Sequence, residues 1–153
     1  FGPDSSASIS NHQEALVVVG VACYLVLKCG IEASDIGVIS FYSAQITLLN
    51  DQFRQVRSDK MRELTVSTVD GFQGAEKKIT LVSAVRTSES VGFLNDPRRL
   101  CVGMSRAQDA RWIFGMFSPL QRSNSDLPSL LDEHRTSGNV IEEDALRQVV
   151  NIR

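Results

Sequence analysis

Two short stretches of this chain combine glycines with polar and charged side chains that can handle phosphate. The first is Asp70-Gly-Phe-Gln-Gly74, which follows an alternating segment that ends at Thr68 and Val69. Ligands of α/β sheets bind beyond the carboxyl ends of the strands, where backbone N–H groups are free. Glycines let the backbone approach a phosphate closely and form concave anion sites. Taken alone, such a stretch more often forms an ordinary tight turn with capping polar groups.

The second stretch carries arginines. Arg106 lies in or just past a predicted helix that Asp96 caps and Pro97 opens, with two more arginines in its first turn. A guanidinium group is always charged and presents a planar fork of donors, which suits the γ-phosphate of a nucleotide. Such a group accelerates phosphoryl transfer by ~10³–10⁵. The alternative is a surface ion pair between Arg106 and a carboxylate such as Asp109, which stabilises little.

One familiar phosphate-binding element is absent from the sequence. The chain contains no Gly-x-x-x-x-Gly-Lys-Ser/Thr loop, so it cannot cradle a triphosphate in the usual way. A nucleotide that meets Arg106 would therefore be held by another domain. The first residue is Phe1 rather than Met, and together with the missing loop this leads us to expect a longer protein.

The composition is that of one globular domain. The chain has 153 residues, of which 42% are hydrophobic and 22% are charged. A formal net charge of -2 excludes a strongly basic coat for nucleic acid but allows a local basic groove. Three cysteines without Cys-x-x-Cys spacing predict neither a disulfide framework nor a zinc site, and fit a reducing compartment. The longest apolar run, 15–27, is too short to span a bilayer.

Hydrophobic periodicity predicts alternating helices and strands. Ser10 and Gln13 form a capping-box pattern before a helix over 11–28 that closes near Gly30. Further predicted elements are a helix over 44–56 and strands over 36–41, 63–68, 79–85 and 111–117. This order indicates an α/β fold with an open, mostly parallel sheet. We expect residues 1–118 to form the main domain, and 119–153 to form a loop and short helices (129–135 and 142–150) that pack on it or extend from it.

The motifs resemble a known family in their order and spacing. Asp70-Gly-Phe-Gln-Gly-Ala-Glu-Lys77, then Gly92-Phe-Leu-Asn-Asp-Pro-Arg-Arg99, then Ser105-Arg-Ala107 are similar to motifs V and VI of superfamily-1 helicases of the senataxin-like and nonsense-decay type. Asn11-His-Gln-Glu-Ala15 looks like the family's Asn-x-x-Glu-Ala segment, and residues 36–45 are similar to motif IV. The resemblance covers about residues 8–118. It implies the second RecA-like domain, a three-layer α/β domain, of an enzyme that hydrolyses ATP to move along RNA or DNA.

The resemblance also implies nucleotide-site residues. By it Arg106 is the arginine finger, Gln73 lies beside the phosphates, and Gly74 and Glu76 line the nucleotide edge, with Glu76 reaching the ribose. His12 stands where some relatives carry a second phosphate-sensing arginine. Because histidine is mostly neutral at pH 7, we favour a first-turn surface role for His12.

Ser40, Tyr42 and Thr68 are implied to lie near the nucleic-acid backbone. The expected cofactor is ATP with Mg²⁺, whose metal ligands would come from the first RecA-like domain of the same protein. We expect RNA, an RNA–DNA hybrid or DNA as the other partner, a monomer, no membrane, and an intracellular location, nuclear or cytoplasmic. The isolated chain is expected to be inactive.

Departures from the family pattern leave alternatives open. The usual Asn of motif VI is Cys101, the motif V segment ends in Lys78 instead of Asp, and motif IV has Phe41 instead of Pro. With His12, these changes motivate a helicase-derived domain that serves as a non-catalytic protein or RNA binding scaffold. A third alternative is an unrelated small nucleotide-binding enzyme, which would bind ATP tightly as this chain alone.

Overall fold

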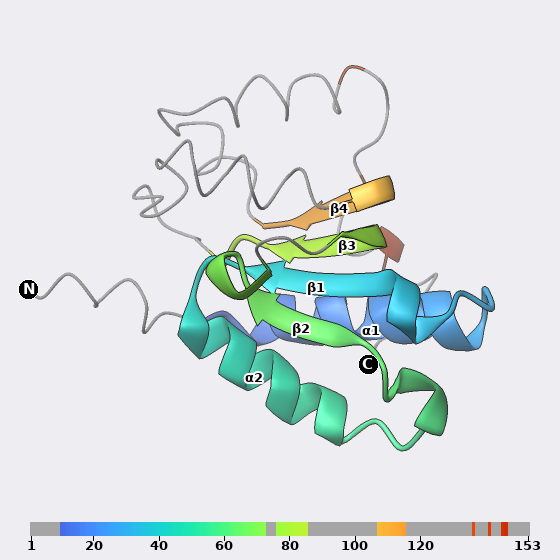
Figure 1. Ribbon diagram of the computed structural model, residues 1–153. Helices are drawn as coiled ribbons and strands as arrows, with labels where there is room; N and C mark the ends of the chain where they lie inside the picture. Colours follow the sequence, from blue (N-terminus) through green and yellow to red (C-terminus); the bar gives the residue numbers. More distant parts are fainter. Residues whose placement is uncertain are drawn as a thin grey trace, which may run out of the picture.

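The computed structural model describes residues 10–72, 76–85 and 107–115, together with 136, 141, 145 and 146. The elements in this part are helices α1 (His12–Leu27) and α2 (Ser43–Arg54) and strands β1 (Ile36–Ser40), β2 (Thr65–Thr68), β3 (Lys77–Ser83) and β4 (Ala107–Phe114) (Figure 1). Single turns of 3₁₀ helix lie at Ala33–Asp35, Asp59–Met61 and Asp70–Phe72. The helix predicted after Asp96 lies outside the described residues.

The four strands form one parallel sheet in the order β2-β1-β3-β4. The predicted open, parallel α/β sheet is therefore confirmed. Because all strands run the same way, their ends define two edges of the sheet. We call one the carboxyl edge, which holds the strand ends Ser40, Thr68, Ser83 and Phe114. We call the other the amino edge, which holds the strand starts Ile36, Thr65, Lys77 and Ala107.

Helix α1 begins one residue later than the capping-box pattern predicts. Asn11, not Ser10, is the N-cap, because its side-chain oxygen accepts a hydrogen bond from the Glu14 N–H at 3.0 Å. The cap satisfies an N–H group that has no partner within the helix. At the other end the chain leaves the helix through Gly30, whose φ of 74° is the left-handed conformation that glycine adopts readily. The strands point toward the side on which α1 and α2 begin (Figure 1).

One hydrophobic core joins the two helices to the sheet. Helix α1 buries residues on nearly all sides, as its all-round apolar sequence predicts, and α2 contributes Leu49 to the same cluster. Ile36 and Val38 of β1 and Leu81 of β3 are fully buried in it. Each such side chain stabilises the fold by about 1.5–3 kcal/mol. Leu146 belongs to the same core.

The strand bounds differ from the predicted ones where polar residues begin a strand. β3 starts at Lys77 and β4 at Ala107, although periodicity predicted their starts at 79 and 111. Gln108 and Asp109 are exposed and lie where the register shifts between the Lys77–Ala107 and Ile79–Ala110 pairs, so apolar periodicity does not reach them. β2 starts at Thr65 rather than at 63, because a 3₁₀ turn ends just before it. Among the described residues no helix is long and apolar enough to cross a bilayer.

Candidate functional site

A buried carboxyl group lies at the carboxyl edge. Glu14, in the first turn of α1, is only 9% exposed. Its Oε1 accepts the Ser83 hydroxyl and, at 2.9 Å, the N–H of Val85. Burial raises the pKa of the Glu14 carboxyl from 4.5 to about 7, and the hydrogen bonds from Ser83 and Val85 lower it in part. Glu14 therefore exchanges its proton near neutral pH.

Ser83 connects this carboxyl group to the turn that follows β1. Its hydroxyl accepts from Gln45 Nε2 at 3.0 Å, and its carbonyl oxygen accepts from the Ser40 hydroxyl at 2.9 Å. Gln45 Oε1 in turn accepts the Asn11 N–H at 2.8 Å. Three segments that are far apart in sequence thus share one buried network. We call it the Glu14 network: Asn11, Glu14, Ser40, Gln45, Ser83 and the N–H of Val85.

The chain leaves β3 in an unusual conformation. Val85 has a φ of 73° and is 3% exposed. A β-branched residue in the left-handed region is a clear outlier and costs about 1–3 kcal/mol. This strained residue donates its N–H to Glu14. It directly precedes, in sequence, the segment 86–106 that ends with Arg106. Such strain is found where surrounding contacts hold the backbone for a functional reason.

The three residues expected near nucleic acid all lie at the carboxyl edge. Thr68 is half-buried at the end of β2, and its hydroxyl accepts the Gly71 N–H at 3.2 Å. Ser40 and Tyr42 are fully buried. The side chains of Ser40 and Tyr42 are therefore not accessible to a ligand in this structure. The candidate contacts at this edge are the Thr68 side chain and the backbone of the turn after β1.

The Asp-Gly-Phe-Gln-Gly stretch begins as a 3₁₀ turn at Asp70–Phe72. Phe72 is 1% exposed and lies over Gly37 of β1, where an added Cβ would come within 2.5 Å of the phenyl ring. Gly71 has a structural reason of its own, because a Cβ there would collide with the Ser67 hydroxyl. β2 ends at the carboxyl edge and β3 starts at the amino edge, so the chain crosses the sheet between these two strands. Gln73 and Gly74 lie outside the described residues.

The amino edge carries the expected ribose contact. Glu76 is exposed directly before β3, and its carboxylate accepts a hydrogen bond from Gln108 Nε2 of β4 at 3.2 Å. Lys77 and Ala107 are registered partners in the sheet. Arg106 precedes Ala107 in sequence but lies outside the described residues.

His12 does not join Glu76 in this structure. It is exposed at the start of α1, whose first turn contacts the carboxyl end of β3 through Glu14. Glu76 precedes the other end of the same strand, which has seven residues and so a length of about 20 Å. Its exposed place in the first turn is the one that we favoured from the sequence, and the alternative phosphate role of His12 stays a prediction.

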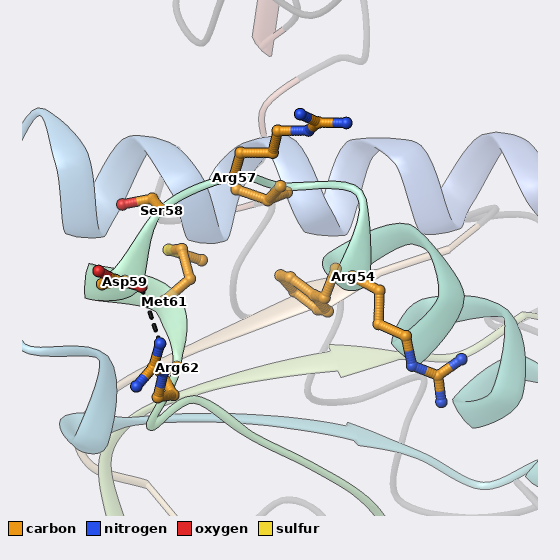
Figure 2. A pocket seen from close by; sticks show the side chains of 8 residues that line it. Arg54, Arg57, Ser58, Asp59, Met61 and Arg62 are labelled. Carbon is orange, nitrogen blue, oxygen red and sulfur yellow. Dashed lines mark hydrogen bonds and ion pairs between the residues drawn. The ribbon is translucent and has the colours of Figure 1, made fainter.

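A basic hollow at the end of α2 escaped the sequence analysis. It encloses about 530 Å³ and is lined by Phe53, Arg54, Val56, Arg57, Ser58, Asp59, Met61 and Arg62. Arg54 pairs with Asp51 at 2.7 Å and Arg62 with Asp59 at 2.9 Å. Figure 2 shows that the three guanidinium groups point in different directions, so they do not converge on one anion. The spacing of the arginines along 54–62 is the signal that marks this surface in the sequence.

Cysteine and metal chemistry are not seen in the described part of the chain. Cys23 and Cys29 are both free thiols, and burial raises the pKa of the Cys23 thiol. Among the described residues no group of three or more His, Cys, Asp or Glu side chains is placed to hold a metal ion.

Comparison with known proteins gives the family. Residues 2–118 match the AAA_12 family model, an AAA domain. The chain is 37% identical over 123 residues to the Schizosaccharomyces pombe helicase required for RNAi-mediated heterochromatin assembly 1, covering 79% of this chain and 12% of that protein. It is 36% identical over 116 residues to the Neurospora crassa regulator of nonsense transcripts 1 homolog, and the match covers 72% of this chain and 10% of that protein. It is 35% identical over 123 residues to Helicase SEN1 of Saccharomyces cerevisiae, and the match covers 76% of this chain and 6% of that protein.

The chain thus spans about a tenth of the length of these relatives. The family match extends over more than half of the chain, and it includes both sheet edges and the Glu14 network. The chain therefore belongs to the AAA_12 family, and its parallel sheet has the RecA-like arrangement of the superfamily-1 helicases of the senataxin-like and nonsense-decay type.

Proposed function

We propose that this chain is the C-terminal motor half of an ATP-dependent helicase that acts on RNA or DNA inside the cell. In this proposal Arg106 is the arginine finger, and the first RecA-like domain of the same protein supplies the phosphate-binding loop and the Mg²⁺ ligands. The chain hydrolyses ATP only together with that domain.

The observation that carries the proposal is the register of β3 and β4. Lys77 pairs with Ala107, and the Glu76 carboxylate bonds to Gln108 on the next strand. Glu76 and Arg106 are the residues that precede this registered pair in sequence. The pairing supports a single nucleotide-facing edge to which both contribute, although they are 30 positions apart in sequence.

The exposed Glu76 suits a nucleotide. A carboxylate is an acceptor with two oxygens, and one bond to Gln108 leaves capacity for the hydroxyl donors of a ribose. ATP, held by the first domain, would supply the phosphoryl group that is transferred to water. Arg106 would place a fixed positive charge against the γ-phosphate, where charge shifts during transfer. Gln73 and Gly74 are proposed to lie along the phosphates.

The carboxyl edge is proposed to form part of the nucleic-acid track. Thr68 offers a half-buried hydroxyl, and the backbone of the turn at Phe41–Ser43 lies beside it at the end of the neighbouring strand. Hydroxyl and backbone N–H groups are typical partners of nucleic-acid phosphates. In this arrangement the nucleotide lies at the amino edge and the nucleic acid at the carboxyl edge. Closure of the two domains around ATP would therefore move the whole sheet relative to the bound nucleic acid.

The proposal is tested by Arg106→Ala in a protein that joins this chain to the first RecA-like domain. We expect kcat for ATP hydrolysis to fall by about 10³-fold or more, because the finger acts in the transition state. The dissociation constant for ATP should change far less, since the other domain grips the nucleotide. Steady-state turnover and equilibrium nucleotide binding give the two quantities.

Arg54→Ala is the matched control, because Arg54 is an exposed arginine in an ion pair on α2. It should leave both quantities unchanged. Wild-type turnover in the Arg106 variant would refute the finger. A joined wild-type protein that binds RNA but never hydrolyses ATP would favour the scaffold alternative.

A further inference from the structure

The buried carboxyl of Glu14 has no part in the nucleotide edge, yet it holds two functional segments. It bonds to the Val85 N–H at 2.9 Å and to the Ser83 hydroxyl. A buried carboxyl is costly, and an apolar side chain at this place would stabilise a helix-on-sheet contact at lower cost. Fully satisfied buried polar networks instead fix one arrangement of the groups they join.

The first segment is the exit from β3. The N–H of Val85 bonds to Glu14 on one side, and the N–H of the preceding Ala84 bonds to the Phe114 carbonyl at 2.9 Å on the other. Both bonds hold the backbone immediately before the Val85 Cα, and the left-handed φ of Val85 follows them. Because valine prefers the extended region, surrounding contacts must hold this conformation. The bond from the Val85 N–H to Glu14 is one such contact, and it anchors the exit from β3.

The second segment is the turn after β1. Ser83, the partner of Glu14, also bonds to Gln45 and Ser40. The Ser40 hydroxyl accepts the Tyr42 N–H at 3.4 Å. Ser83 thus connects the Glu14 carboxyl to the backbone that borders the carboxyl edge.

We propose that Glu14 is a positioning residue that couples the turn at Phe41–Ser43 to the exit of β3 at Val85. It touches neither ligand and acts through Ser83 and the Val85 N–H. The coupling itself rests on the contacts above. Its consequence for nucleic-acid binding rests on the proposed function.

The test compares three variants of this chain. Glu14→Gln keeps a side-chain oxygen of the same reach, Glu14→Asp keeps the carboxyl but shortens the side chain by one methylene, and Glu14→Ala removes the group. Amide hydrogen exchange is followed at Val85 and Tyr42, with Leu49 in the middle of α2 as the reference. We expect Asp and Ala to speed exchange at Val85 and Tyr42 by about ten-fold more than at Leu49, because local opening needs only these bonds. Gln should stay close to the wild type.

Glu32→Ala is the matched control, since Glu32 is an exposed glutamate beyond the other end of α1. It should change none of the three amides. An equal rise at Leu49 would show general destabilisation and overturn the proposal. Exchange that rises at Val85 but not at Tyr42, or a Gln variant as defective as Asp, would overturn it too. Should the Ala variant fail to fold, Asp and Gln still decide.

A second measurement separates this proposal from the proposed function. Fluorescence anisotropy with a labelled single-stranded uridine oligonucleotide is measured at equal folded fractions. Glu14→Asp should weaken binding by about ten-fold, and Glu14→Gln should not. If the wild-type chain binds no oligonucleotide, the nucleic-acid track fails, while the exchange result still decides the positioning role.

Discussion

At the scale of single residues, Glu14 shows how a group can be present for arrangement rather than for chemistry. Its carboxyl lies among uncharged partners, and burial is the largest cause of its raised pKa. The folded state therefore keeps the Glu14 proton up to about pH 7, whereas the unfolded chain releases it near its ordinary value. Stability tied to this proton is complete below the unfolded pKa and is lost as pH rises through the folded one.

We predict that the free energy of unfolding falls as the pH rises from about 4.5 to about 7. The Glu14 contribution to this fall is at most about 3 kcal/mol. Urea unfolding at several pH values gives the profile. In Glu14→Gln, which cannot ionise, this part of the fall should vanish. A Gln variant with the same profile as the wild type would refute the assignment to Glu14.

The sequence reveals single residues only where the signal is local. It placed the start of α1 to within one residue, but chose Ser10 over Asn11, because several polar residues precede the helix and only geometry shows which side chain reaches Glu14 N–H. The Glu14 network joins residues up to 71 positions apart, and no spacing rule predicts such contacts. The same holds for the left-handed Val85, since valine is a poor candidate for that conformation.

At the scale of elements, the turn after β2 combines local hydrogen bonds with the packing of one aromatic ring on one glycine. Phe72 fills the space above Gly37, and this contact fixes where the crossing toward Glu76 begins. A glycine in a buried strand weakens the strand itself. Gly37 is nevertheless required at this position, because a Cβ there would occupy the space that the Phe72 ring fills.

Gly37→Ala should lower the free energy of unfolding by about 1–3 kcal/mol, because the new methyl group displaces the Phe72 ring from a packed site. Chemical denaturation measures the loss. In a double-mutant cycle with Phe72→Leu, the combined loss should be smaller than the sum of the two, since the smaller side chain relieves the clash. Additive losses would show that the ring and the glycine do not interact.

The elements were the most predictable part of the chain. Apolar runs located three strands of the described sheet and an alternating segment located β2, while parallel pairing followed from the alternation of strands with helices. The errors lie at strand starts such as Lys77 and Ala107, where backbone pairing continues beyond the apolar residues. The hydrophobic pattern predicts which residues are buried. It does not predict strand residues that are exposed and belong to the sheet only through their backbone.

At the scale of the whole molecule, the candidate residues divide between two opposite edges. Glu76 lies at the amino edge, whereas Thr68, Tyr42 and His12 lie at the carboxyl edge. The sequence analysis put the phosphate-binding turn at the carboxyl ends of the strands. The described structure shows instead that this turn begins there and leads across to the other edge.

We predict that the isolated chain does not turn over ATP. The reason is that the sequence has no Gly-x-x-x-x-Gly-Lys-Ser/Thr loop to grip the triphosphate. Release of inorganic phosphate by the purified chain, with and without single-stranded RNA, provides the measurement. Addition of the first RecA-like domain should restore turnover. Measurable hydrolysis by the chain alone would instead support the small nucleotide-binding enzyme.

The strand order also governs how the chain can assemble during synthesis. β3 must pair with β4, whose last residue is Phe114, so its outer side stays without a partner while some thirty further residues leave the ribosome. Unpaired strand edges of this kind invite aggregation, and non-local pairing slows folding. Lys77 and Lys78 place two positive charges at the start of that strand. Positive charges beside an unpaired strand oppose its association with a second copy, because like charges repel.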